Sequence, residues 1–164
     1  MEIVQAYPNC PKYIQKRDFS GHKVSSVPVG NNLKNWIETL DTLFVASSSV
    51  DGNLDLSHRG GNKGFVKWIA EDILRIPDYR GNSMFNTLGN FYDNPLAGLL
   101  FVDFSNGDTV QLTGSAIVHL NEEGFESFTG GTNRFWDFKV EKIIYKKSLP
   151  DFRMDLIDYS PYNP

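Results

Sequence analysis

The clearest periodic pattern in the chain is an apolar stripe over residues 33–40. The i, i+3, i+4, i+7 spacing of a helix with one buried face is met by Leu33, Trp36, Ile37 and Leu40. The asparagine at position 31 or 32 is a suitable N-cap for such a helix. The pattern therefore predicts one amphipathic helix ahead of the first strands.

The next segments alternate short apolar runs with turn residues. Residues 42–48 are rich in β-branched and aromatic side chains, and the turn signal Asp51-Gly52 predicts a hairpin that returns over residues 53–58. Similar runs, bounded by glycine, proline, asparagine or aspartate, predict further strands over residues 65–69, 73–77, 96–104, 109–120 and 135–145. Hairpin-linked strands pair antiparallel, and such a sheet best loses its edges by closing into a barrel. We therefore expect a mainly β fold with six or seven strands and two helices.

The two ends of the chain read differently from its middle. Prolines and glycines recur through residues 1–30, so we expect an irregular arm there and one domain over residues 31–164. Tyr13, Ile14 and Phe19 give the arm apolar surface that we expect to pack on the body or on a partner. The final segment, residues 152–164, is too apolar to extend freely into water.

Composition narrows the class of protein. The chain has 164 residues and a formal net charge of −4, which suits one folded domain and disfavours a surface that coats nucleic acid. Its one cysteine, Cys10, cannot form an internal disulfide and favours a reducing compartment, the cytoplasm by default. The longest apolar runs are far shorter than the ~20 residues of a membrane span. We expect no membrane partner.

The most distinctive polar segment is the glycine loop at residues 60–64 with the strand before it. Ser57, His58, Arg59 and Lys63 place a hydroxyl, an imidazole and two cations beside three glycines. Backbone N–H groups in such a loop can line an anion, and Arg59 offers a planar fork to a phosphate or a flavin carbonyl. The alternative is a glycine turn with solvated charges.

A second polar segment precedes and begins the helix predicted over residues 83–92. Asn82, Asn86 and Asn90 share one helical face, and a helix N-terminus favours anions through its free N–H groups. Capping plus a solvated face is the alternative reading. Two such segments in one small domain favour a phosphorylated ligand.

Several familiar catalytic patterns are missing from the sequence. There is no dinucleotide or Walker glycine motif, no Gly-x-Ser-x-Gly elbow and no metal-ligand spacing around His22, His58 and His119. We read His119 as a surface residue and Cys10 as a structural thiol. Nucleotide hydrolysis and zinc chemistry are therefore disfavoured.

An ordered series of motifs resembles one family. The series comprises Phe44-Val45-Ala46-Ser47, Ser57-His58-Arg59-Gly60-Gly61, Pro77-Asp78-Tyr79-Arg80-Gly81-Asn82, Asn86-Thr87-Leu88-Gly89-Asn90 and Gly98-Leu99-Leu100-Phe101. Together these motifs resemble the pyridoxamine 5′-phosphate oxidase-like FMN-binding split barrels, from about residue 33 to residue 118. Residues 9–14 also resemble the segment that precedes the barrel in longer, two-part members, so the chain matches the C-terminal part of those.

The resemblance implies a six-stranded antiparallel split barrel, a homodimer, and one FMN in each cleft at the subunit interface. Carried over position by position, it implies cofactor contacts at Ser57, His58, Arg59, Gly60, Gly61, Lys63, Gly64, Phe65, Arg80, Asn82, Asn86, Thr87, Thr109, Gln111 and Trp136. Asn82, Asn86 and Thr87 lie where the family holds the phosphate. Thr109 and Gln111 lie on a wall strand that contacts the flavin, and Trp136 would come from the second subunit.

The chain also departs from the vitamin B6 oxidase itself. A basic triplet at the phosphate-binding helix is replaced by Phe85-Asn86-Thr87, so Arg59, Lys63 or Arg80 must supply positive charge. The oxidase's C-terminal substrate-binding signature is missing, so we do not expect oxidation of pyridoxamine phosphate. The leading hypothesis is an FMN-dependent oxidoreductase of unknown substrate, with Arg59 stabilising the reduced ring and His58 relaying a proton. The alternatives are a non-catalytic flavin-binding or stress-response module, and a barrel without cofactor.

Overall fold

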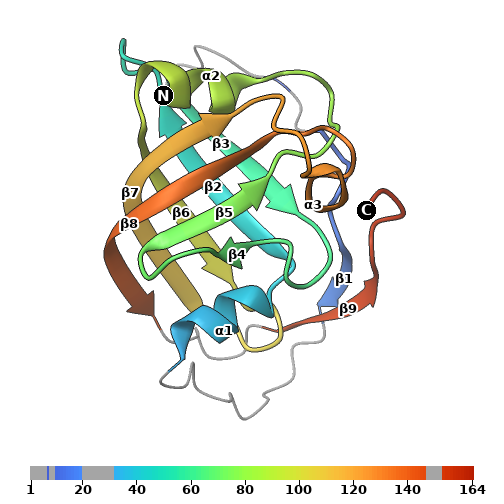
Figure 1. Cartoon of the computed structure of the whole chain (residues 1–164). Helices are drawn as coiled ribbons and strands as arrows, with labels where there is room; N and C mark the ends of the chain where they lie inside the picture. Colours follow the sequence, from blue (N-terminus) through green and yellow to red (C-terminus); the bar gives the residue numbers. More distant parts are fainter. Residues whose placement is uncertain (1–6, 8–9, 20–31, 147–152) are drawn as a thin grey trace.

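The computed structural model describes residues 7, 10–19, 32–146 and 153–164, and within them antiparallel strands dominate (Figure 1). One seven-stranded sheet has the order β3-β2-β6-β7-β8-β5-β4. Its strands are β2 (Thr42–Ser48), β3 (Leu54–Gly60), β4 (Lys67–Trp68), β5 (Ile73–Pro77), β6 (Leu96–Val102), β7 (Thr109–His119) and β8 (Phe135–Lys146). The predicted mainly β, antiparallel fold is thereby confirmed, with seven strands in the main sheet where the resemblance implied a six-stranded barrel. The sheet does not close completely, because β3 and β4 remain its two edges.

The described residues also form three short helices. Helix α1 (Leu33–Glu38) follows the predicted stripe, buries Ile37, and is capped by Asn32, whose side chain accepts from the N–H of Asn35. Helix α2 (Asn86–Asp93) begins three residues later than predicted, because Ser83 has φ +63°, which no α-helix contains. Helix α3 (Glu126–Thr129), a single turn that ends at left-handed Gly130, was not predicted from the sequence.

Alternation along the strands creates one continuous core. Leu43 and Val45 of β2, Val110 of β7, and Trp136 and Phe138 of β8 are completely buried. The sheet curls around these side chains, and α2 packs against β2 and β7 at one end. The predicted strand over residues 65–69 shrinks to β4, because the N–H of Phe65 closes a turn on the carbonyl of Asn62.

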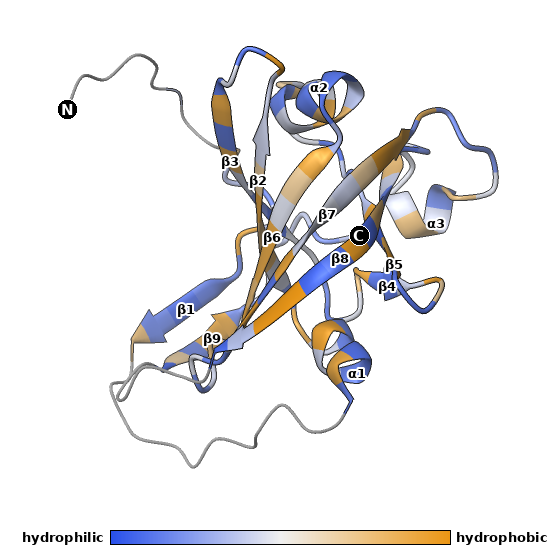
Figure 2. Cartoon of the chain, turned by 90° about the vertical axis from the view of Figure 1, so that its left-hand side faces the viewer, coloured by the Kyte–Doolittle hydropathy of each residue, from blue (hydrophilic) through white to orange (hydrophobic). Residues whose placement is uncertain are grey.

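The outer face of the same sheet carries exposed apolar residues, and the hydropathy colours of Figure 2 mark hydrophobic positions along β3, β6 and β8. Leu54 and Leu56 of β3, Leu96 of β6 and Ile117 of β7 alternate with buried positions. Ile144 of β8 shares this face, although its neighbours Ile143 and Tyr145 are exposed as well. Leu54 is 83% exposed and Ile117 is 65% exposed. Exposed apolar residues that gather on one face are a feature of surfaces that other protein chains cover.

The described parts of the two chain ends lie together. Strand β1 (Lys16–Phe19) pairs antiparallel with β9 (Met154–Asp158) in a separate two-stranded sheet. The arm packs on the body through Tyr13, as predicted, whereas Ile14 and Phe19, which were predicted to pack as well, are 48% and 62% exposed. The rings of Tyr13 and Tyr79 lie 5.1 Å apart, so the arm reaches the segment between β5 and α2.

Candidate functional site

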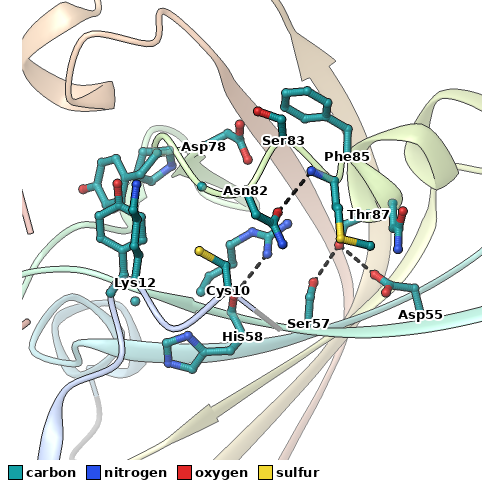
Figure 3. Close-up of a pocket in the computed structure, with 18 of the residues that line it drawn as sticks. Cys10, Lys12, Asp55, Ser57, His58, Asp78, Asn82, Ser83, Phe85 and Thr87 are labelled. Carbon is teal, nitrogen blue, oxygen red and sulfur yellow. Dashed lines mark hydrogen bonds between the residues drawn. The ribbon is translucent and has the colours of Figure 1, made fainter. Parts of the chain in front are cut away.

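A pocket opens at the edge of the sheet, where β3 faces the segment between β5 and α2 (Figure 3). The arm forms its third side through Cys10, Lys12 and Tyr13. Eight of the predicted site residues line it: Ser57, His58, Arg59, Gly60, Phe65, Asn82, Asn86 and Thr87. The structure therefore brings the two polar segments of the sequence into one place.

Four side chains form a continuous hydrogen-bonded chain on the β3 side of the pocket. Tyr7 donates to one carboxylate oxygen of Asp55 at 2.6 Å, and Thr87 donates to the other at 2.8 Å. The Thr87 hydroxyl also lies 2.6 Å from the Ser57 hydroxyl (Figure 3). Asp55 and Thr87 are buried, so this chain ties the start of α2 firmly to β3.

Arg59 follows Ser57 on the same side of β3, because strand side chains alternate. Its Nη1 donates to the backbone carbonyl of His58 at 3.1 Å, while its buried Nε has no hydrogen-bond partner among the described residues. No described carboxylate lies within ion-pair distance of Arg59. Burial lowers the pKa of Arg59, although Asp78 and Asp55 oppose this effect. The pocket thus contains a cation with an unused donor.

The side chain of His58 lies on the opposite face of β3 from the side chains of Ser57 and Arg59. Burial, followed by the charges of Arg59 and Arg17, lowers the pKa of His58 to about 4. The His58 ring lies edge-on to the ring of Phe44, with the ring centroids 5.7 Å apart. The two residues are paired directly across strands β3 and β2. The lowered pKa favours the neutral imidazole at pH 7, and the proton relay by His58 stays a prediction.

The glycines at the end of β3 serve close packing. A Cβ on Gly60 would lie 2.1 Å from the carbonyl oxygen of Tyr13, and one on Gly61 would lie 2.8 Å from Phe65. These positions admit the arm and the Phe65 ring to the strand end. Gly64 has φ +81°, which the turn before β4 requires.

The polar residues before α2 are partly used for local structure. The side chain of Asn82 accepts from the N–H of Met84 at 3.1 Å, and Phe85 occupies the N-cap position. Asn90 donates to Ser47 at 3.0 Å and so joins α2 to β2. Asn82 and Asn86 remain at the pocket wall.

The other predicted site residues do not line this pocket: Gly61, Lys63, Gly64, Arg80, Thr109, Gln111 and Trp136. Arg80 contributes its carbonyl, which accepts from the Tyr13 hydroxyl at 2.9 Å. Thr109 and Gln111 occupy outward positions of β7, beside the exposed apolar face. Trp136 is 0% exposed and packs 5.0 Å from Phe91, so its ring has no surface for a cofactor; we correct that assignment.

Several pocket residues were not predicted. Asp55 could have been found, because it precedes Ser57 and Arg59 at the i, i+2, i+4 spacing of one strand face. Tyr79, whose pKa burial raises to about 12, lies in the motif at residues 77–82, but the resemblance assigned it no cofactor contact. Cys10 and Lys12 reach the pocket only through the path of the arm, which no local pattern specifies.

A second cluster lies away from the pocket. His119 stacks on Phe135 at 4.7 Å, and its Nε2 is 3.2 Å from Asp137, which Arg75 also binds through two hydrogen bonds of 2.8 Å. His119 is therefore a partly buried member of a structural network rather than a simple surface residue. Among the described residues, no group of three His, Cys, Asp or Glu side chains could hold a metal ion.

Comparison with known proteins supports the fold and gives no direct function. No family model and no curated protein matches the chain. HupZ from Group A Streptococcus is similar in structure, with a TM-score of 0.58 and 15% identity over 75% of this chain and 98% of that one. HutZ, the heme storage protein of Vibrio cholerae, has a TM-score of 0.52 and 11% identity, covering 74% and 98%.

A third similar structure comes from the family that the motifs resemble. It is the Clostridium acetobutylicum protein related to general stress protein 26 of the pyridoxinephosphate oxidase family, with a TM-score of 0.50 and 14% identity, covering 75% and 90%. The chain thus has the split-barrel fold of these proteins, as the resemblance predicted. No helix within the described ranges is long and apolar enough to cross a membrane.

Proposed function

We propose that this chain binds a flavin, FMN in the first instance, in the pocket between β3 and α2. The observation that carries the proposal is the Arg59 side chain, which lines a pocket of the split-barrel fold and whose buried Nε has no hydrogen-bond partner among the described residues. A buried donor is costly unless a ligand satisfies it. A flavin ring offers carbonyl and nitrogen acceptors that suit a guanidinium.

The residues present fit such a group. Phe65 and Tyr79 line the pocket with aromatic surface, and Arg59 and Lys12 supply positive charge. Arg59 would hold the polar edge of the ring, and Lys12 would balance negative charge near the mouth. When bound, a flavin supplies one- or two-electron transfer, while the protein binds and orients it.

The test is a visible absorption spectrum of the purified protein, before and after incubation with FMN and desalting. Retained flavin bands in the wild-type chain, and their loss in Arg59→Ala, are the expected result. A colourless protein after that treatment would remove the flavin proposal. Because one similar structure is a heme storage protein, incubation with hemin is run in parallel.

Turnover is the second part of the proposal, an oxidoreductase of unknown substrate. The rival is a flavin-holding or stress-response module, which the similarity to a protein related to general stress protein 26 favours. Bleaching of bound flavin by NADH or NADPH, followed by recovery with an electron acceptor, favours the enzyme. Tight flavin without such a cycle favours the module.

We also propose that two copies pair through the exposed apolar face of the sheet. Leu56 of β3 and Ile117 of β7 belong to that face, and burying them would remove apolar surface from water. Thr109 and Gln111 lie on the same face, so pairing would carry them towards the partner copy. Light scattering should give twice the chain mass, and Ile117→Asp should yield monomers. We propose a reducing compartment, the cytoplasm, as the location of the protein, because its single cysteine, Cys10, forms no disulfide.

A further inference from the structure

The hydrogen-bonded chain on β3 has a fixed direction. Asp55 accepts at both carboxylate oxygens, from the hydroxyls of Tyr7 and Thr87. A threonine hydroxyl has one proton, so the proton of Thr87 is committed to Asp55. The 2.6 Å contact between Ser57 and Thr87 is therefore donated by Ser57. Ser57 keeps only its lone pairs for any ligand in the pocket.

Arg59 has the opposite polarity at the next position on the same strand face. A guanidinium is a pure donor, and its buried Nε has no described partner. Ser57 and Arg59 are two residues apart and both line the pocket, so an acceptor and a donor stand about 7 Å apart along β3. The long Arg59 side chain can shorten that separation at its tip.

We infer that Ser57 and Arg59 together bind an N–H group and a neighbouring carbonyl of the ligand. The side of the pocket formed by Ser57 and Thr87 then does not hold a phosphate. The inference rests on the proposed flavin, whose pyrimidine edge presents an N3–H between two carbonyls. Ser57 would accept from N3–H while Arg59 donates to a neighbouring carbonyl. A phosphate offers acceptors only and carries negative charge, which Ser57 cannot satisfy and buried Asp55 repels.

This orientation is the reverse of the one that the motif resemblance implied. The phosphate was expected at Asn82, Asn86 and Thr87. Thr87 has no proton left to donate, so this position has lost its hydroxyl donor and keeps only the side-chain amides of Asn82 and Asn86. The phosphate of FMN would then lie away from Asp55, and riboflavin should bind nearly as well as FMN.

The experiment is a fluorescence titration of the full chain with three flavins: FMN, riboflavin and 3-methylriboflavin, in which a methyl group replaces the N3 proton. Riboflavin and FMN are expected within about fivefold of each other in Kd. 3-Methylriboflavin should bind about tenfold or more weakly, because Ser57 loses its donor and stays buried without one. The comparison needs no variant, so it does not depend on a mutant that folds.

Two variants then assign the effect to Ser57. Ser57→Ala should bind riboflavin and 3-methylriboflavin within about threefold of each other, since the acceptor is gone. Thr87→Val should also shrink the difference, because it frees the Ser57 proton for the pocket. Ser127→Ala in α3, an exposed serine far along the chain, should keep the wild-type ratio.

The outcomes separate the two proposals. If no flavin binds, both the proposed function and this inference fall. If flavins bind but the N3-methyl form binds as well as riboflavin, the inference alone fails. A preference for FMN over riboflavin above about a hundredfold that Thr87→Val abolishes would place the phosphate on Thr87 and also overturn it.

Discussion

The side chain of Gln15 accepts a hydrogen bond of 2.8 Å from the backbone N–H of Ser160, which lies 145 positions further along the chain. Gln15 is 4% exposed, and its Nε2 donates at 3.1 Å to the carbonyl of Gly61. One buried amide thus joins the arm, the C-terminal segment and the glycine loop beside the pocket.

Replacing Gln15 by alanine should therefore release both chain ends. The loss leaves buried groups unsatisfied, so we expect unfolding in urea to require about 1 to 3 kcal/mol less free energy. Gln15→Glu keeps an acceptor for Ser160 but turns a buried carboxylate oxygen towards the carbonyl of Gly61, so it should be no more stable than the alanine variant. Equal stability of all three proteins would contradict this role.

Replacing Arg59 by alanine should weaken flavin binding more than fold stability. A hydrogen bond from a charged group contributes about 1.5 to 3 kcal/mol, which corresponds to a rise in Kd of roughly 10- to 150-fold. Fluorescence titration measures this rise. Arg153→Ala, which removes a surface pair with Asp155, is the control and should bind as wild type. An unchanged Kd for Arg59→Ala would remove Arg59 from the site.

Alanine substitutions at Gly60 and Gly89 should change the stability of the fold in opposite directions. In Gly60→Ala the new methyl would meet the carbonyl of Tyr13 at 2.1 Å, so the arm must shift and we expect a loss of about 1 to 3 kcal/mol. Gly89 lies inside α2, where a Cβ would meet nothing within 4 Å, and Gly89→Ala should add up to about 1 kcal/mol through helix propensity. Thermal denaturation should shift the two melting temperatures in opposite directions.

Stability should fall in mild acid because of His58. Burial lowers its pKa from 6.5 to about 4, so the unfolded chain takes up a proton at a higher pH than the folded chain. Folding is therefore most favoured above pH 6.5, and on the order of 2 kcal/mol is lost as the pH falls towards 4. Urea unfolding at several pH values measures the slope. His58→Gln should flatten it, whereas His119→Gln should not.

Trp136 should prove to be a core residue. Trp136→Phe leaves space between Phe91 and Phe138, so we expect a loss of about 1 to 3 kcal/mol of stability. Flavin affinity should stay within about twofold of wild type. A folded variant with no flavin affinity would return Trp136 to the cofactor site.

Local patterns predicted most of the strands and placed α1, because burial on one face repeats with the period of the element. They placed α2 only approximately. Ser83 adopts a left-handed backbone conformation that residue propensities do not predict. Helix α2 therefore begins only after it. The short α3 has too few residues to show a period.

The sequence by itself determined the class of fold and the two polar segments of the site, because alternation, turn residues and motif order are local properties of the chain. Only the tertiary structure decided which groups meet. In the folded chain Asp55 accepts a hydrogen bond from Thr87, Trp136 lies in the core, and the arm lines the pocket. These contacts join residues far apart in sequence, and they depend on how the whole sheet curls rather than on any local preference.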